Sequence, residues 1–190
     1  MACLIVTACL APRPLLPVTA SRARVIAQEQ ELSFDPAAAA AIDFSGIWSR
    51  IHCEGLEESL VARGASADAA KKQASAPYEM EWQRRKAGGL VWRVTCGARA
   101  LDYEVGEWEE IIPGGASPPF DQKGVVARFT TYVPVDKANG GMVHFTRTAS
   151  PSGCVETVSR YLVDGGMVCS RFVEMDGKTL ESLELFARKD

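Results

Sequence analysis

The chain has 190 residues, of which 47% are hydrophobic and 24% charged, and its formal net charge at pH 7 is -3. This length and composition are typical of one globular domain with a sizeable core, and the interspersed charges exclude a basic stripe for nucleic acid. The six cysteines are widely spaced without a CxxC motif and there are only two histidines, which argues against a zinc site or a dense disulfide framework and favours a reducing compartment.

Residues 1–42 are predicted to be an N-terminal tail outside the domain. They contain no acidic residue before Glu29 and are interrupted by prolines. An organelle presequence, a disordered cytosolic tail and a secretory signal all fit this composition, and the apolar run 2–11 is too short to span a bilayer. The Ala-rich stretch DPAAAAAID is predicted to be a linker, so that the domain covers 43–190. We expect a cytoplasmic protein, or a plastid or mitochondrial one if the tail is a presequence.

The domain is predicted to open with a strand at 44–53, FSGIWSRIHC. The next segment, 55–77, has the Ala, Leu, Glu and Lys content that is typical of helices. Gly64 is suited to ending a first short helix, and Ser66 to capping a second one. The segment therefore predicts a helix-turn-helix.

Nine further strands are predicted after the helices. Turn signals recur at short spacing, which is typical of an all-β barrel or sandwich built from hairpins. One connection, 113–124, is too rich in Pro and Gly for a strand interior. The nine predicted strands cover 78–86, 90–96, 98–105, 107–112, 125–133, 142–148, 154–163, 167–175 and 179–188.

This order of elements resembles the intracellular lipid-binding protein family, the cytosolic fatty-acid- and retinoid-binding proteins of the calycin superfamily. FSGIWSR is similar to the family's opening Phe-x-Gly-x-Trp, and GGMVHFTR and SRYLVDGGMV resemble two late strands and the turn between them. The resemblance covers 43–190. It implies a ten-stranded antiparallel up-and-down β-barrel, or clam, with a helix-turn-helix lid between strands 1 and 2 and a ligand cavity inside. It also implies that Trp48 packs near the base of the barrel.

The hairpin turns predict the register of the last three strands. VDGG and MDGK each indicate a two-residue turn. Counting from these turns places Arg160 opposite Cys169 and Cys169 opposite Glu184. Arg160 also lies where the family carries an inward arginine, which implies that this row faces the interior. We therefore predict a contact between Arg160 and Glu184, with Arg171 beside them.

The resemblance makes the inward residues candidates for binding a ligand. The family's last strand usually carries Arg-x-Tyr for a ligand carboxylate, and neither residue is present here. Both an anionic ligand, held by the surplus of arginine, and a neutral ligand remain open. Alternation along the strands supplies the apolar part of the predicted site. The predicted ligand-binding residues are Arg160, Arg171, Glu184, Ser182, Phe186, Cys169, Met167, Met80, Trp82 and Tyr103.

The predicted function is noncatalytic binding and carriage of a hydrophobic small molecule such as a fatty acid, a retinoid or another lipid. No Ser elbow, Cys/His signature or phosphate-binding loop is present, and no cofactor is expected. Two alternatives remain: a structural or interaction module of a larger organellar assembly with a collapsed pocket, and a lipid isomerase with Glu184 as general base. The expected partner is the lipid alone, bound by a monomer without a transmembrane segment.

Overall fold

The computed structural model describes residues 36–86, 89–112, 124–134, 141–149 and 153–189. The predicted loop 113–124 therefore lies almost wholly outside the described residues, as does the tail up to residue 35. Within the described ranges no helix is long and apolar enough to cross a membrane.

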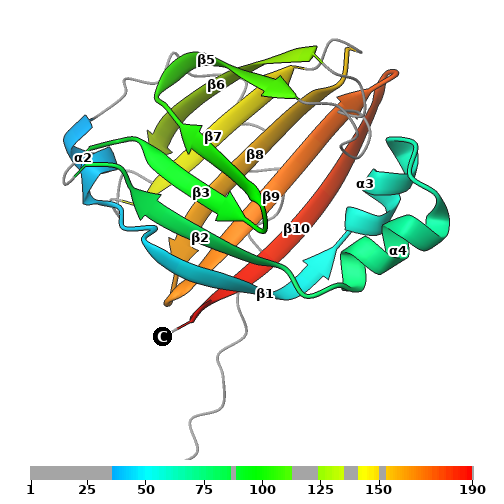
Figure 1. The fold of residues 1–190 in the computed structure, drawn as a ribbon, viewed down its shortest axis with the longest axis horizontal. Coiled ribbons are helices and arrows are strands. Elements are labelled where there is room, and N and C mark those ends of the chain that lie inside the picture. The colour runs from blue at the N-terminus through cyan, green and yellow to red at the C-terminus, as the bar shows by residue number, and fades with distance from the viewer. Residues whose placement is uncertain (1–35, 87–88, 113–123, 135–140, 150–152, 190) are drawn as a thin grey trace, which may run out of the picture. The chain divides into compact units, whose positions relative to one another are not determined.

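Ten strands form one antiparallel sheet that curls into a clam-like barrel (Figure 1). The sheet order is β4-β3-β2-β1-β10-β9-β8-β7-β6-β5, so that β4 and β5 are consecutive along the chain but form its two edges. The predicted all-β, ten-stranded fold is confirmed. The strands are β1 (Gly46–Glu54), β2 (Glu79–Arg84), β3 (Trp92–Cys96), β4 (Arg99–Tyr103), β5 (Gly106–Ile112), β6 (Gly124–Pro134), β7 (Met142–Ala149), β8 (Val155–Val163), β9 (Gly166–Met175) and β10 (Lys178–Lys189).

The predicted helix-turn-helix is α3 (Leu56–Ala62) followed by α4 (Ala67–Ser75), between β1 and β2. The Ser66 hydroxyl caps α4 by accepting a hydrogen bond from the Ala69 amide at 3.3 Å, as predicted. Gly55 precedes α3 with a positive φ of 68°, and a Cβ there would clash with the carbonyl oxygen of Glu181 in β10. This glycine therefore allows the helix pair to start close against the barrel.

The stretch predicted to be a linker contains a helix instead. It is α2 (Pro36–Ala41), and Ala39 on it is buried in the main core together with Phe44. A short run of alanine has a high helix propensity, and the apolar contact orders it. The packed structure thus includes residues before Asp43, while the nature of the tail stays a prediction.

The two late hairpins have the predicted turns and register. Asp164 and Gly165 have φ values of 46° and 80°, and the turn at 176–177 has the same left-handed pattern, which suits type I′ turns. Arg160 pairs with Cys169, and Cys169 with Glu184. Alternate residues of β10 are buried from Ser182 to Phe186, which confirms the predicted inward face.

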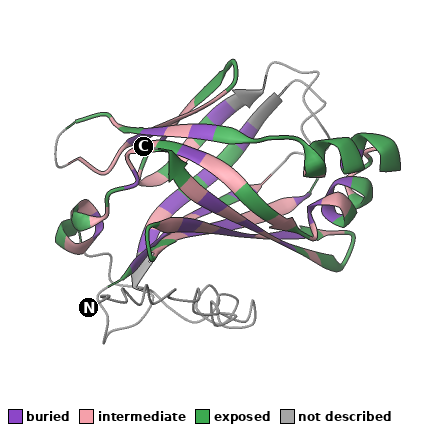
Figure 2. Ribbon diagram, turned by 90° about the horizontal axis from the view of Figure 1, so that it is seen from below, coloured by how far each residue is buried: buried purple, intermediate pink, exposed green. Residues whose placement is uncertain are grey.

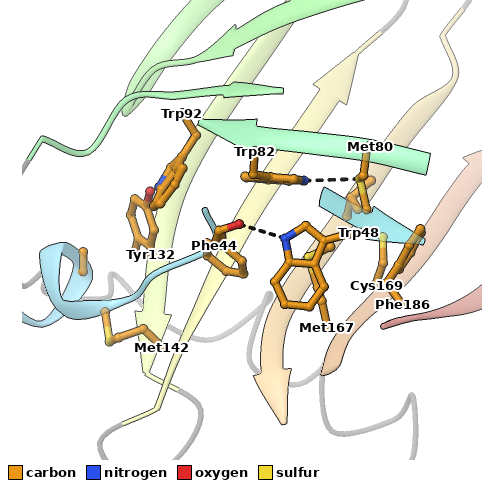
Figure 3. Close-up of a cluster of buried hydrophobic side chains, with 12 residues drawn as sticks. Phe44, Trp48, Met80, Trp82, Trp92, Tyr132, Met142, Met167, Cys169 and Phe186 are labelled. Carbon is orange, nitrogen blue, oxygen red and sulfur yellow. Dashed lines mark hydrogen bonds between the residues drawn. The ribbon is translucent and has the colours of Figure 1, made fainter. Parts of the chain in front are cut away.

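The main core fills one end of the barrel. Large aromatic side chains meet there, and the Trp48 indole donates a hydrogen bond to the Phe44 carbonyl at 2.8 Å (Figure 3). Trp48 thus has the structural role that was predicted for it. A smaller cluster joins the buried sides of the two helices, with Leu56 and Leu60 from α3 and Ala70 from α4, while the outer surface of the pair is exposed (Figure 2). The large aromatic side chains thus occupy one part of the barrel interior, and the part next to α3 contains a cavity.

Candidate ligand-binding cavity

A cavity of about 310 Å³ lies inside the barrel, between the aromatic core and the helix pair. This volume is at the lower end of the roughly 300–1,000 Å³ that is usual for ligand pockets. Helix α3 and strands β2 to β4 supply most of the apolar wall, and β8 to β10 complete it. The apolar lining consists of Leu56, Leu60, Tyr78, Met80, Trp82, Val94, Cys96, Leu101, Tyr103, Val158, Cys169 and Phe186.

The rest of the lining is strongly charged. Six arginines and two glutamates of the described residues line the cavity, and a buried guanidinium is costly unless it is paired. The pairing of each arginine therefore decides what the cavity can bind. The charged lining residues are Arg50, Arg63, Arg99, Arg128, Arg160, Arg171, Glu156 and Glu184.

Five of these residues form one chain of ion pairs next to the helices, which we call the helix-side cluster: Arg50, Glu184, Arg171, Glu156 and Arg63. Arg50 Nη1 lies 3.0 Å from Glu184 Oε2, and Arg171 Nη2 lies 3.7 Å from Glu184 Oε1. Glu156 Oε1 lies 3.2 Å from Arg171 Nε and 3.4 Å from Arg63 Nη1. The cluster thus joins β1, β10, β9, β8 and the end of α3.

Charge complementarity outweighs burial at the centre of this cluster. Burial by itself raises the pKa of Glu156, but the positive charges of Arg171 and Arg63 reverse the effect and lower it below its usual value of 4.5. Burial also lowers the pKa of Arg63, which Glu156 opposes. Glu156 is therefore a carboxylate at neutral pH and is engaged by two guanidinium groups.

Arg50 also binds the end of helix α4. Its Nη2 donates to the carbonyl oxygens of Gln73, Ala74 and Ala76 at 3.0, 2.9 and 2.7 Å. A cation at this end satisfies carbonyls that have no partner within the helix and complements the helix dipole. One side chain therefore couples the α4 end of the lid to Glu184 inside the barrel.

A second ion cluster, the edge cluster, connects the two edges of the sheet. Glu110 of β5 accepts hydrogen bonds from Arg99 of β4 and from Arg128 of β6, whose Nε lies 2.8 Å from Glu110 Oε2. The Tyr103 and Trp108 rings also meet across this gap, with centroids 5.7 Å apart and an edge-on geometry. Side chains thus bridge β4 and β5 where backbone pairing is absent.

Arg160 is the buried arginine of the cavity that belongs to neither cluster. Its side chain leans toward β7, where Nη1 donates to His144 Nδ1 at 3.4 Å. The guanidinium carbon lies 5.2 Å from the centre of the Tyr103 ring and 5.6 Å from that of Trp82. Among the described residues no carboxylate oxygen lies within the 4.0 Å ion-pair distance of Arg160, although the residue is only 7% exposed.

Most of the predicted site residues line the cavity. Ser182 and Met167 are the exceptions: both are buried, but Met167 belongs to the aromatic core and Ser182 lies beside the cavity without lining it. Ligand binding by any of the predicted residues stays a prediction. The eight that line the cavity are Arg160, Arg171, Glu184, Phe186, Cys169, Met80, Trp82 and Tyr103.

The predicted contact between Arg160 and Glu184 is wrong. Strand β9 separates the two backbones by two strand spacings, roughly 9 to 10 Å, whereas Arg50 lies on the strand next to Glu184. The nearer guanidinium groups of Arg50 and Arg171 take the carboxylate. Arg160 instead contacts His144 of β7, on the side of β8 away from β10.

The sequence reasoning missed the other members of the two clusters. Glu156 had a readable signal, because it precedes Arg160 by four residues in one strand and so shares its inward face. Arg50 had a similar signal, because it follows the buried Trp48 by two residues in β1 and so shares its inward face. Its pairing with β10 could not be counted from the sequence, since the register shifts between Arg50 and His52. Arg63 lies at a helix end, which strand alternation does not describe.

No protein-family model and no curated protein sequence matches the chain. Solved structures do match. The fluorescent protein UnaG is 18% identical with a TM-score of 0.53, over 77% of this chain and 97% of that one. Caenorhabditis elegans lipid binding protein 8 is 14% identical with a TM-score of 0.55, over 84% and 100% of the two chains. Zebrafish ileal bile acid-binding protein, in complex with cholic acid, is 13% identical with a TM-score of 0.54, over 77% and 98%.

These identities are low, and the similarity extends over nearly the whole length of each matched structure. The TM-scores above 0.5 over this length establish that the chain has the fold of the lipid-binding proteins, which the sequence resemblance predicted. The assignment of the fold therefore no longer depends on short motifs alone.

Proposed function

We propose that this chain is a noncatalytic binding protein for one hydrophobic small molecule with an anionic head group, held in the barrel cavity. The observation that carries the proposal is Arg160, a buried guanidinium that lines the cavity with no carboxylate within ion-pair distance in the described part of the chain. The names of two similar structures, which denote binding of lipids and of bile acids, support the class of ligand.

The energetics of Arg160 favour an anionic partner. Its neutral neighbours are the His144 ring nitrogen and the faces of Trp82 and Tyr103, which offset only part of the cost of removing a guanidinium from water. A ligand carboxylate would add charge-assisted hydrogen bonds, each worth about 1.5–3 kcal/mol. The volume of about 310 Å³ suits a short or compact apolar body.

The state of the acids supports a protein without catalysis. Both glutamates that line the cavity are within ion-pair distance of two arginines each. A general base for a lipid isomerase needs a carboxylate whose proton affinity matches its task, and the pKa of Glu156 is lowered instead. Glu184 lies between Arg50 and Arg171, so the arrangement favours a structural role for it.

The open volume of the cavity also favours a carrier over a module with a collapsed pocket. Size-exclusion chromatography of the native protein separates these two functions. A carrier is expected to elute as a free monomer, whereas stable co-migration with a large complex would support the module.

The binding test uses the purified protein and two ligands of equal length, decanoate and decan-1-ol, measured by isothermal titration calorimetry. We expect Arg160→Ala to weaken decanoate binding by about 10-fold or more and decanol binding by much less, since only decanoate loses a charge-assisted contact. Arg85→Ala serves as a control, because Arg85 is half-exposed and does not line the cavity. Equal losses for the two ligands would refute the head-group role of Arg160, and uptake of neither ligand by the wild type would refute the function.

A further inference from the structure

We propose that His144 is a positioning residue that fixes Arg160 without neutralising it, and that this neutral support sets the preference of the cavity for anions. The inference rests on the proposed function. It adds a second residue, His144, which affects the choice between anionic and neutral ligands through its hydrogen bond to Arg160 and not through contact with the ligand.

The geometry determines the tautomer of His144. β7 and β8 pair so that His144 lies directly opposite Arg160. A guanidinium only donates hydrogen bonds, so Nδ1 of His144 must be the acceptor of the 3.4 Å contact and the ring proton must lie on Nε2. The imidazole therefore offers a lone pair, not a charge, to Arg160.

The surroundings keep the imidazole neutral. His144 is fully buried, and its described ring neighbours are Phe44, Trp82, Tyr103 and Tyr132, with centroids 5.3 to 6.0 Å away and edge-on geometry. Burial and the adjacent positive charge of Arg160 both hold the pKa of His144 well below its usual value. Its Nε2 has no hydrogen-bond partner among the described residues. The aromatic rings thus fix the plane of the ring while adding no charge.

The two ion clusters show what the alternative support looks like. Arg171 lies between Glu156 and Glu184, and Arg128 is bound by Glu110, so a carboxylate already compensates each of these buried guanidinium groups. Among the described buried arginines that line the cavity, Arg160 is the one whose side chain is held by a neutral acceptor instead of a carboxylate. A rigid but uncharged partner leaves Arg160 without a carboxylate at contact distance, a place that a ligand anion can take.

The test changes the charge of the acceptor while keeping an acceptor in place. His144→Gln retains a neutral oxygen that can accept from Arg160, whereas His144→Glu supplies a carboxylate. Phe145→Glu is the matched control, because it adds the same charge at the next position of β7, whose side chain alternates to the other face. Calorimetry with decanoate and decan-1-ol gives the ratio of the two affinities for each variant.

We expect the preference for decanoate to stay within about 3-fold of the wild type in His144→Gln and Phe145→Glu, and to fall at least 10-fold in His144→Glu with decanol binding nearly unchanged. An unchanged preference in His144→Glu would overturn the inference, as would an equal fall in the Gln and Glu variants. A wild type without preference would overturn the proposed function itself. If near-UV circular dichroism shows that His144→Glu does not fold, His144→Leu replaces it: a selective loss of decanoate affinity supports the positioning role, and an unchanged ratio overturns it.

Discussion

Arg50 is predicted to hold the helical lid on the barrel, and Arg50→Met tests this directly. Methionine keeps much of the length and apolar stem of the side chain but removes the guanidinium. The substitution breaks the ion pair with Glu184 and the three hydrogen bonds to the carbonyls of Gln73 and Ala74 in α4 and of its C-cap Ala76. Both contacts are lost in one step because the same group makes them.

The size of the effect follows from burial. The side chains of Arg50 and Glu184 are both only 6% exposed, and removing one partner of a buried pair costs about 3–5 kcal/mol. Arg171 remains 3.7 Å from Glu184, so the lower end of this range, about 3 kcal/mol, is expected. With a urea dependence of about 2 kcal/mol per molar, the unfolding midpoint should fall by about 1.5 M.

Urea unfolding measures the global effect, and amide hydrogen exchange shows where it acts. Protection in α3 and α4 should fall more than protection in the barrel strands, since the lost contacts join the two. Arg85→Met is the control, because its ion pair with Asp102 is half-exposed and worth less than about 1 kcal/mol. A loss in Arg50→Met no larger than in the control, with unchanged exchange in α4, would show that Arg50 does not hold the lid.

Three further predictions concern stability. Arg171 lowers the pKa of Glu156 below 4.5, so the stabilisation by this ion pair is fully present above pH 4.5 and is lost as the pH falls through the lower pKa of the folded state. Urea midpoints measured at decreasing pH should show this loss. A loss from the pair of Glu156 and Arg171 already well above pH 4.5 would contradict the prediction. Ser66→Ala should cost about 1 kcal/mol and speed amide exchange at Ala69, whereas unchanged exchange there would exclude a capping role. Asp176→Val should cost about 1–3 kcal/mol in the free energy of unfolding because φ is 50° at this position, while Asp176→Asn should be nearly neutral; equal costs would contradict the strain argument.

Turn chemistry made the C-terminal half of the fold predictable. Each Asp-Gly pair specifies a two-residue hairpin, and the side-chain alternation then sets the face of every residue in both strands, from Arg160 to Glu184. The helix-turn-helix was predictable for a similar reason, since Ser66 carries its own capping signal. The sequence was sufficient to predict an element wherever a few neighbouring residues specify its turn or its helix cap.

The partners of the charged residues were not predictable in this way. A row of paired residues gives the order of side chains across a face but not the direction in which a long side chain leans. Glu184 pairs with Arg50, which lies 134 residues earlier in the chain. Arg50 in turn binds carbonyl oxygens at the end of α4, 23 to 26 residues further along the chain, a contact that exists only once the helix pair has folded onto the barrel. Such contacts depend on segments far apart in the sequence, so one strand pattern cannot reveal them.

The ion pairs of Glu184 explain how an anion site can exist although β10 lacks Arg-x-Tyr. An acid in the interior would cancel the head-group arginine only if the two were paired, and here Glu184 lies within ion-pair distance of Arg50 and Arg171 instead. The helix-side cluster holds three arginines against two glutamates, and the edge cluster two arginines against one glutamate. Among the described residues neither cluster places a carboxylate oxygen within ion-pair distance of Arg160, whose own hydrogen-bond support is a neutral imidazole. The distribution of partners, rather than the number of acids, therefore favours an anionic over a neutral ligand.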